Sequence, residues 1–183
     1  DELNLAVELD TTSGEAQVRL DVVSSKSDAV EELRYSKKRS KKKWDELVEK
    51  LIKKHAERAK LVDYQTPVAT ENGQRSIQPV NFTVPGYALK EAARLTVPLS
   101  LFRTPFDTTF NSDVKYRDHD IRRGTYRVST YRMKLRIPEG YRLQPSLKNF
   151  STDAKVVQLD VNITADSDVV EIEQKLTWRP GHY

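Results

Sequence analysis

"YRMKLRIPEGYRLQ", residues 131–144, alternates apolar side chains with cations and then stops at a turn. The apolar set takes every second position: Tyr131, Met133, Leu135 and Ile137. The cations take the positions between: Arg132, Lys134 and Arg136. Successive side chains of a strand point to opposite faces of a sheet, so this stretch predicts a strand with one buried and one wet face.

The same alternation of apolar and polar side chains occurs along most of the chain. Residues 1–24 read as a hairpin, with apolar residues alternating on both sides of the turn DTTSG, residues 10–14. A second hairpin turn is expected at ENGQ, residues 71–74. Further strands are predicted at 60–67, 76–84, 93–99, 125–137, 154–164 and 168–178. In the strand 125–137 the apolar phase changes, which predicts a β-bulge near Ser129–Thr130.

Residues 28–58 break this pattern and predict a helical insertion. Asp28, followed three residues later by Glu31, is typical of a helix start, and a stronger helix is expected from Ser40. Five apolar residues then form one stripe at helical spacing: Trp44, Leu47, Val48, Leu51 and Ile52. We expect this stripe to be buried on the sheet.

These patterns predict a mainly β protein: an antiparallel β-sandwich of the immunoglobulin or fibronectin type with a helical insertion near residues 28–58. The 183 residues are expected to form a single domain, 1–183, and any sub-boundary is expected near residues 100–124. No apolar run approaches the roughly 18 residues of a membrane span. The first ten residues lack the basic and apolar blocks of an uncleaved signal peptide.

Charge is unevenly distributed along a chain whose net charge is +4. Residues 1–24 hold six acids and one arginine, a net of −5, and residues 31–60 hold twelve cations and six acids, a net of +6. We interpret the cation row of the opening stretch as the solvated face of a sheet. Opposite charges pair across adjacent strands, so Glu171 and Glu173 or their neighbours are expected to balance this row.

The run KKRSKKK, residues 37–43, is the strongest candidate for contact with a polyanion. Its cations are Lys37, Lys38, Arg39, Lys41, Lys42 and Lys43. Clusters of this kind bind polyanions by displacing their counterions. The run has no interleaved aromatic platform and no motif that reads nucleic acid, so no nucleic-acid partner is expected. The acids of the first hairpin are expected to offset its charge.

Patterns that support catalysis or metal binding were not found. The chain has no cysteine, no nucleophile elbow and no phosphate loop, so we expect no enzymatic activity, no catalytic residue and no cofactor. Asp118, His119 and Asp120 resemble part of a metal site, but a second histidine at ligand spacing is missing and no metal is expected. Tyr126 and Tyr131 are expected to face the core.

Short segments at turns and strand ends carry a family resemblance: Pro85-Gly86-Tyr87-Ala88, Val97-Pro98-Leu99 with Pro105-Phe106, and Ile137-Pro138-Glu139-Gly140-Tyr141. With its order of hairpin, helices and strands, the chain resembles the C-terminal β-rich region of secreted Bacteroidetes-type proteins of uncharacterised function. In those proteins a β-rich N-terminal domain precedes a transglutaminase-like domain, and a further β-sandwich domain follows. The cysteine–histidine–aspartate chemistry belongs to the transglutaminase-like domain, and no residue here matches it.

The resemblance implies a non-catalytic accessory β-sandwich module of an exported bacterial protein, located in the periplasm or at the cell surface. Its implied partner is the transglutaminase-like catalytic domain of the same precursor, on which it packs or which it positions. The alternative is a binding module for an anionic glycan or polymer through the basic helical segment. A glycan or another protein is the further partner considered. A third interpretation is an enzyme with a site in the connection 103–124.

Overall fold

Strands dominate the computed structural model of the chain. It describes residues 2–25, 27–70, 75–92, 94–98, 122–123, 126–144, 148–154 and 157–182. In chain order the elements are β1 (Glu2–Leu9), β2 (Ala16–Ser25), α1 (Ser27–Ser36), α2 (Lys41–His55), β3 (Lys60–Tyr64), β4 (Val68–Thr70), β5 (Arg75–Val84), β6 (Leu89–Glu91), β7 (Arg94–Thr96), β8 (Arg122–Arg123), β9 (Arg127–Arg136), β10 (Phe150–Ala154), β11 (Val157–Ala165), β12 (Val169–Trp178) and β13 (Gly181–His182). The predicted mainly β protein with a helical insertion near residues 28–58 is confirmed.

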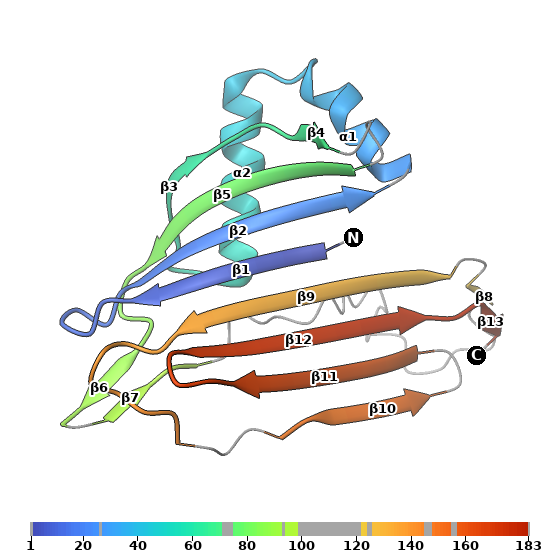
Figure 1. Ribbon diagram of the computed structural model, residues 1–183. Helices are drawn as coiled ribbons and strands as arrows, with labels where there is room; N and C mark the ends of the chain where they lie inside the picture. The colour runs from blue at the N-terminus through green and yellow to red at the C-terminus, as the bar shows by residue number, and fades with distance from the viewer. Residues whose placement is uncertain are drawn as a thin grey trace, which may run out of the picture.

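One nine-stranded sheet runs through the molecule (Figure 1). Its strand order is β10-β11-β12-β9-β1-β2-β5-β3, and β4 also pairs with β5. All its pairs are antiparallel except β1 with β9, which run parallel. The sheet is therefore mixed, whereas the sequence predicted an antiparallel one. An immunoglobulin-like sandwich is not confirmed, because these nine strands form one continuous sheet.

Residues 131–136 of the stretch YRMKLRIPEGYRLQ lie in β9, the strand that joins the two halves of this sheet. Met133 is aligned with Leu5 of β1 on one side and with Ile172 of β12 on the other. The predicted β-bulge near Ser129–Thr130 is wrong, because β9 and β12 stay in unbroken register along the whole of β9. Ser129 and Thr130 point to opposite faces and both are buried. Because the strand is buried on both faces at this point, apolar residues can occur on either face. The alternation of the sequence therefore changes here without the extra residue of a β-bulge.

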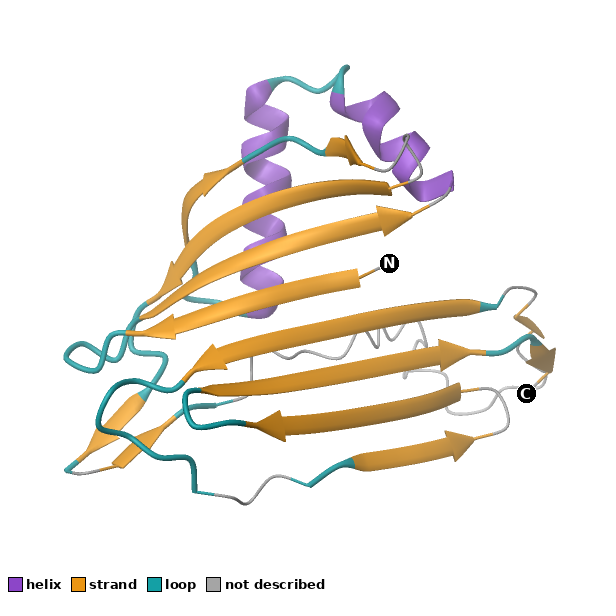
Figure 2. Ribbon diagram, viewed as in Figure 1, coloured by secondary structure: helices purple, strands orange, loops and turns teal. Residues whose placement is uncertain are grey.

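The apolar side chains gather on one face of the sheet, called here the core face. Its most buried members include Leu5, Val7, Val18, Leu20, Val80, Phe82, Met133 and Ile172. Helix α2 lies against this face behind β1, β2 and β5 (Figure 2). The part of the chain that the structure describes contains no helix long and apolar enough to cross a membrane.

Helix α2 buries a narrower stripe than the sequence predicted. Its buried residues are Trp44, Val48, Ile52 and His55. Leu51 is half-buried against the core, whereas Leu47 is 42% exposed, so the expectation that the whole stripe is buried is wrong at Leu47. Each residue of a helix is rotated by about 100° from the one before it. This rotation places Leu47 to one side of the line of buried residues, nearer to solvent.

The predicted first hairpin is confirmed, with Leu9 of β1 opposite Ala16 of β2. Asp10 orders its turn by accepting hydrogen bonds from the Thr12 N–H and from the Ser13 hydroxyl, each at 2.8 Å. Several predicted features lie outside the described residues: the turn at 71–74, most of the connection 103–124 with its sub-boundary, and His119. Tyr126, expected to face the core, is 65% exposed just before β9, whereas Tyr131 is buried as predicted.

Candidate functional site

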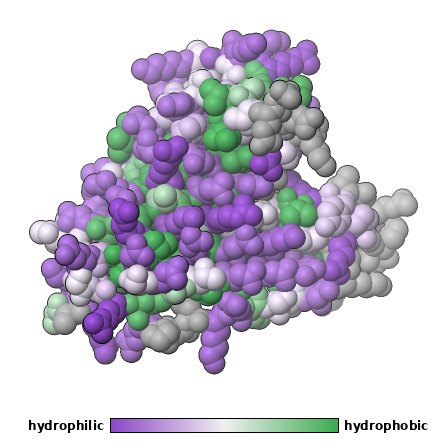
Figure 3. Space-filling view, in the orientation of Figure 1, coloured by the Kyte–Doolittle hydropathy of each residue, from purple (hydrophilic) through white to green (hydrophobic). Residues whose placement is uncertain are grey.

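The cation row of β9 lies on the solvent face, the face of the sheet opposite the core face. In Figure 3 this face looks toward the viewer, and hydrophilic residues cover much of it. Each cation has an acidic partner on a neighbouring strand: Arg132–Glu173 at 2.7 Å, Lys134–Glu171 at 2.6 Å and Arg136–Glu8 at 3.4 Å. The interpretation of this row as a balanced, solvated sheet face is confirmed, and the row is not a vacant surface for an anion.

Three acids of the first hairpin, Glu2, Glu8 and Asp21, form ion pairs on the sheet. Glu2 of β1 pairs with Arg132 at 3.2 Å and with Arg75 of β5 at 3.5 Å. Asp21 of β2 pairs with Arg19 of the same strand at 3.3 Å. Among the described residues, no acid of this hairpin forms an ion pair with the basic run, so the expected offset of its charge has no ion-pair support. The parallel pairing of β1 with β9 explains the difference, because it places the acids of β1 beside the arginines of β9.

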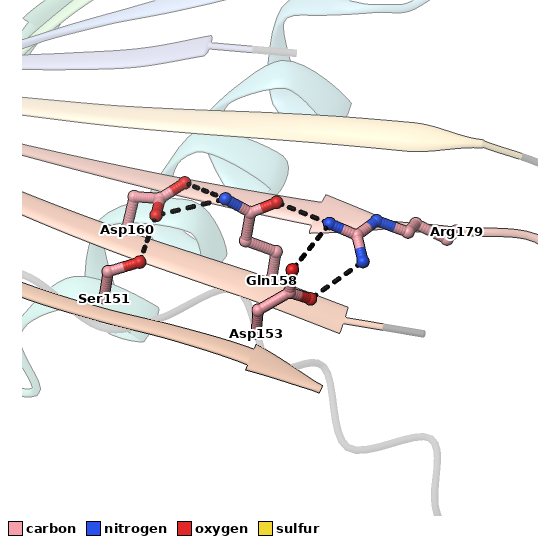
Figure 4. A network of polar contacts seen from close by, with 5 residues as sticks. All are labelled: Ser151, Asp153, Gln158, Asp160 and Arg179. Atoms are coloured by element: carbon pink, nitrogen blue, oxygen red, sulfur yellow. Dashed lines mark hydrogen bonds and ion pairs between the residues drawn. The ribbon is translucent and has the colours of Figure 1, made fainter. Parts of the chain in front are cut away.

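A second polar cluster crosses β10 and β11 on the solvent face (Figure 4). Asp160 accepts hydrogen bonds from the Ser151 hydroxyl at 2.6 Å and from the Gln158 amide at 3.0 Å. These bonds stabilise the carboxylate and hold the pKa of Asp160 below its usual value. Arg179 donates to Asp153 at 2.8 Å and to Gln158 Oε1 at 2.6 Å. The hydrogen bonds and charge of Asp153 raise the pKa of Arg179.

An open hollow of about 450 Å³ lies beside this cluster. Its lining residues are Asn149, Phe150, Ser151, Asp160, Asn162, Glu173 and Lys175. Several of the polar groups already bond within the protein, since Asn149 accepts from the Ile163 N–H at 2.8 Å and Ser151 donates to Asp160. Ser151 and Lys175 both line the hollow, but the hydrogen bond that the Ser151 hydroxyl donates goes to the Asp160 carboxylate.

Residues 37–43, called here the basic turn, connect α1 to α2 at the end of the helical pair farthest from β10 (Figure 1). The structure brings all six predicted cations together on this connection and the first turn of α2. Five of them are exposed: Lys37, Lys38, Lys41, Lys42 and Lys43. None of the five forms an ion pair with another described residue. The basic turn thus differs from the β9 row in having charge that its described surroundings do not balance.

The position of these lysines on the helix adds to the local positive potential. Lys41, Lys42 and Lys43 form the first turn of α2, directly after the N-cap Ser40, whose hydroxyl accepts from the Lys43 N–H at 3.4 Å. That turn contains no acid. A helix N-terminus carries partial positive charge, so each cation there is unfavourable by about 0.3–1 kcal/mol. The chain therefore concentrates cations where the helix tolerates them least.

Arg39 is the exception within the basic turn. Its guanidinium carbon lies 4.9 Å from the ring centroid of Trp44 and 5.7 Å from that of Tyr35. Tyr35 belongs to the last turn of α1 and Trp44 to the first turn of α2. Arg39 is half-buried between the helices, whereas the other five cations are exposed.

Other titratable groups serve the packing of the core. Burial and the Asp45 carboxylate, which accepts from the Tyr64 hydroxyl at 2.7 Å, raise the pKa of Tyr64 to about 12. Burial also raises the pKa of Tyr131 to about 12. His55 is buried at the C-terminal end of α2. Within the described ranges, no three His, Asp or Glu side chains gather as metal ligands.

Comparison of the chain with protein-family models, with curated proteins and with solved structures gave no match. The function must therefore be argued from the residues and their geometry.

The sequence predicted the six cations but not the different surroundings of Arg39. The three residues are close in the sequence, since Tyr35 and Arg39 stand four residues apart and Trp44 follows five residues later. Residues four apart share a face only within one continuous helix. Here the helix breaks between them, so the sequence could not show that the two rings approach the same guanidinium.

Proposed function

We propose that this chain is a non-catalytic binding module for an anionic glycan and that the basic turn is its contact surface. The observation that carries the proposal is the contrast between two cation sets. Arg132, Lys134 and Arg136 have acidic partners, whereas the five exposed lysines of the basic turn have none among the described residues.

The geometry favours a polymer over a single small anion. An exposed lysine attracts one anionic group weakly, by about 0–1 kcal/mol, and salt screens the attraction. Several lysines on one short connection act together on a chain of anionic groups and release its counterions.

The test is a titration of labelled heparin, a sulfated glycan, at two salt concentrations, with duplex DNA as a comparison. We expect heparin affinity to fall steeply as salt rises, in proportion to the number of lysine contacts. Duplex DNA is expected to bind no tighter than the roughly 10⁻⁴–10⁻⁶ M of non-specific contacts at physiological salt. Absence of salt-dependent heparin binding would refute the proposal, and much tighter binding of DNA would redirect it to nucleic acid.

We propose as a second candidate the accessory role in an exported bacterial protein that the family resemblance implies. One feature of the core face favours it. Phe150 of β10 is 55% exposed, and the core-face side chains of β11, among them Leu159 and Val161, are only half-buried. In this proposal a transglutaminase-like domain of the same precursor covers these strands and supplies the second layer of a sandwich.

This candidate is tested on the full-length precursor. If a catalytic domain covers β10 and β11, Phe150→Asp should weaken its association with this chain by at least tenfold, because a carboxylate would be buried in an apolar contact. The exposed Val62 of β3 provides the control, since Val62→Asp should leave association unchanged. A precursor without such a domain, or equal effects of both substitutions, would contradict the accessory role.

A further inference from the structure

Arg39 lies between the two helices that the basic turn connects. Its guanidinium group faces the ring of Tyr35 from α1 and the ring of Trp44 from α2, at 5.7 and 4.9 Å. Trp44 is buried, with only 4% of its surface exposed, whereas Tyr35 is 51% exposed. Arg39 therefore links a fixed ring in the core to a ring at the surface.

The backbone on either side of Arg39 is also fixed by hydrogen bonds. At the end of α1 the Lys38 N–H donates to the Tyr35 carbonyl at 3.0 Å, and the Ser36 hydroxyl donates to the Leu33 carbonyl at 2.8 Å. At the start of α2 the Trp44 N–H donates to the Ser40 carbonyl at 3.1 Å. The stack of Arg39 on two rings joins these two bonded ends across the connection.

We infer that Arg39 is a positioning residue, which holds the basic turn in one conformation and does not itself contact the anionic polymer. This inference rests on the proposed function. With the turn held, Lys37 and Lys38 on one side and Lys41, Lys42 and Lys43 on the other present their charges together. A surface that is ordered before binding avoids the entropic cost of ordering it on binding. Arginine suits the role because its planar, weakly hydrated guanidinium group stacks on aromatic rings, whereas an ammonium group is compact and strongly hydrated.

Salt dependence separates a residue that contacts the polymer from one that positions other residues. The slope of log affinity against log salt counts the cations in contact, at roughly 0.7–0.9 per cation for nucleic acids. Lys42→Ala and Arg39→Ala each remove one positive charge. Lys42→Ala should reduce the slope by about that amount. Arg39→Ala should leave the slope unchanged and lower heparin affinity by roughly three- to tenfold at every salt concentration.

Three further substitutions and one double variant separate positioning from contact. Arg39→Lys preserves the charge and should nevertheless lose affinity as Arg39→Ala does. Tyr35→Ala removes a ring without changing any charge and should also lower affinity, whereas Tyr35→Phe should bind as the wild type does. The double variant Arg39→Ala with Tyr35→Ala should be no weaker than either single variant, because the two side chains act as one unit. Circular dichroism melts of each variant establish that both helices remain folded.

The outcomes distinguish the inference from the proposed function on which it rests. If Arg39→Lys binds as the wild type does, or Arg39→Ala lowers the slope as Lys42→Ala does, Arg39 is a contact residue and the inference fails alone. Additive losses in the double variant would mean that Tyr35 touches the polymer itself, which also overturns the inference. A wild-type protein without salt-dependent heparin binding would overturn both.

Discussion

At the scale of single residues, the backbone of Gly14 decides how the first hairpin meets the rest of the chain. Gly14 has φ of 71°, a left-handed conformation that glycine adopts without steric cost. Its carbonyl accepts from the Ala88 N–H at 2.9 Å, and a Cβ at this position would approach the Ala88 carbonyl oxygen to 2.4 Å. The turn therefore excludes every side chain for two independent reasons.

Gly14→Ala should lower the free energy of unfolding by about 2–4 kcal/mol, combining the left-handed backbone cost with overpacking. Gly140→Ala is the matched control, because Gly140 has φ of 83° but no atom within 4 Å of the added Cβ. The control should lose only about 1–2 kcal/mol. Equal losses of the two variants in urea unfolding would show that the close approach of Ala88 is unimportant.

The Asp160 carboxylate should make stability depend on pH. Hydrogen bonds from Ser151 and Gln158 lower its pKa in the folded protein, so its contribution is present above the unfolded-state pKa of about 4 and is lost as pH falls below it. Asp160→Asn should therefore flatten the acidic limb of a plot of unfolding free energy against pH. Ser151→Ala should flatten it in part. Acidic limbs identical to the wild type would contradict this assignment.

At the scale of elements, helix α2 is held by its buried stripe and not by its full apolar content. Ile52 is fully buried in the core cluster, whereas Leu47 is largely exposed. Ile52→Ala should cost about 2–5 kcal/mol of unfolding free energy, because it leaves a cavity. Leu47→Ala should cost less than about 0.5 kcal/mol, as at other surface positions. A urea-unfolding series in which Leu47→Ala costs as much as Ile52→Ala would show that α2 packs in a different rotation.

Most of these elements could be predicted because their signals are local. Alternation predicted β1, β2, β5, β9, β11 and β12, and the capping residue Ser40 correctly marked the start of α2. Strand β10 was not predicted, since FSTDA has no apolar alternation and all five of its residues are exposed. The parallel contact of β1 with β9 was not predicted either. It joins residues more than a hundred positions apart, and no local pattern encodes such pairing.

At the scale of the whole molecule, charge is partitioned between two surfaces. The solvent face of the sheet carries ion pairs between its strands, and Glu2 contacts two arginines there. The basic turn carries exposed lysines at a helix N-terminus without an ion pair to a described residue. The run of cations was visible in the sequence. Its lack of partners was not, because that depended on which strand the hairpin acids would meet.

Two triple variants with the same change in net charge test this partition most directly. One converts Lys41, Lys42 and Lys43 to Ala, and the other converts Arg132, Lys134 and Arg136 to Gln, so each removes three positive charges. Heparin affinity is measured for both by fluorescence anisotropy at one low and one physiological salt concentration. We expect the lysine variant to lose at least tenfold in affinity and much of the salt dependence, and the sheet variant to bind within about threefold of the wild type. Equal losses in the two variants would show that heparin responds to net charge alone and would contradict the basic turn as the contact surface.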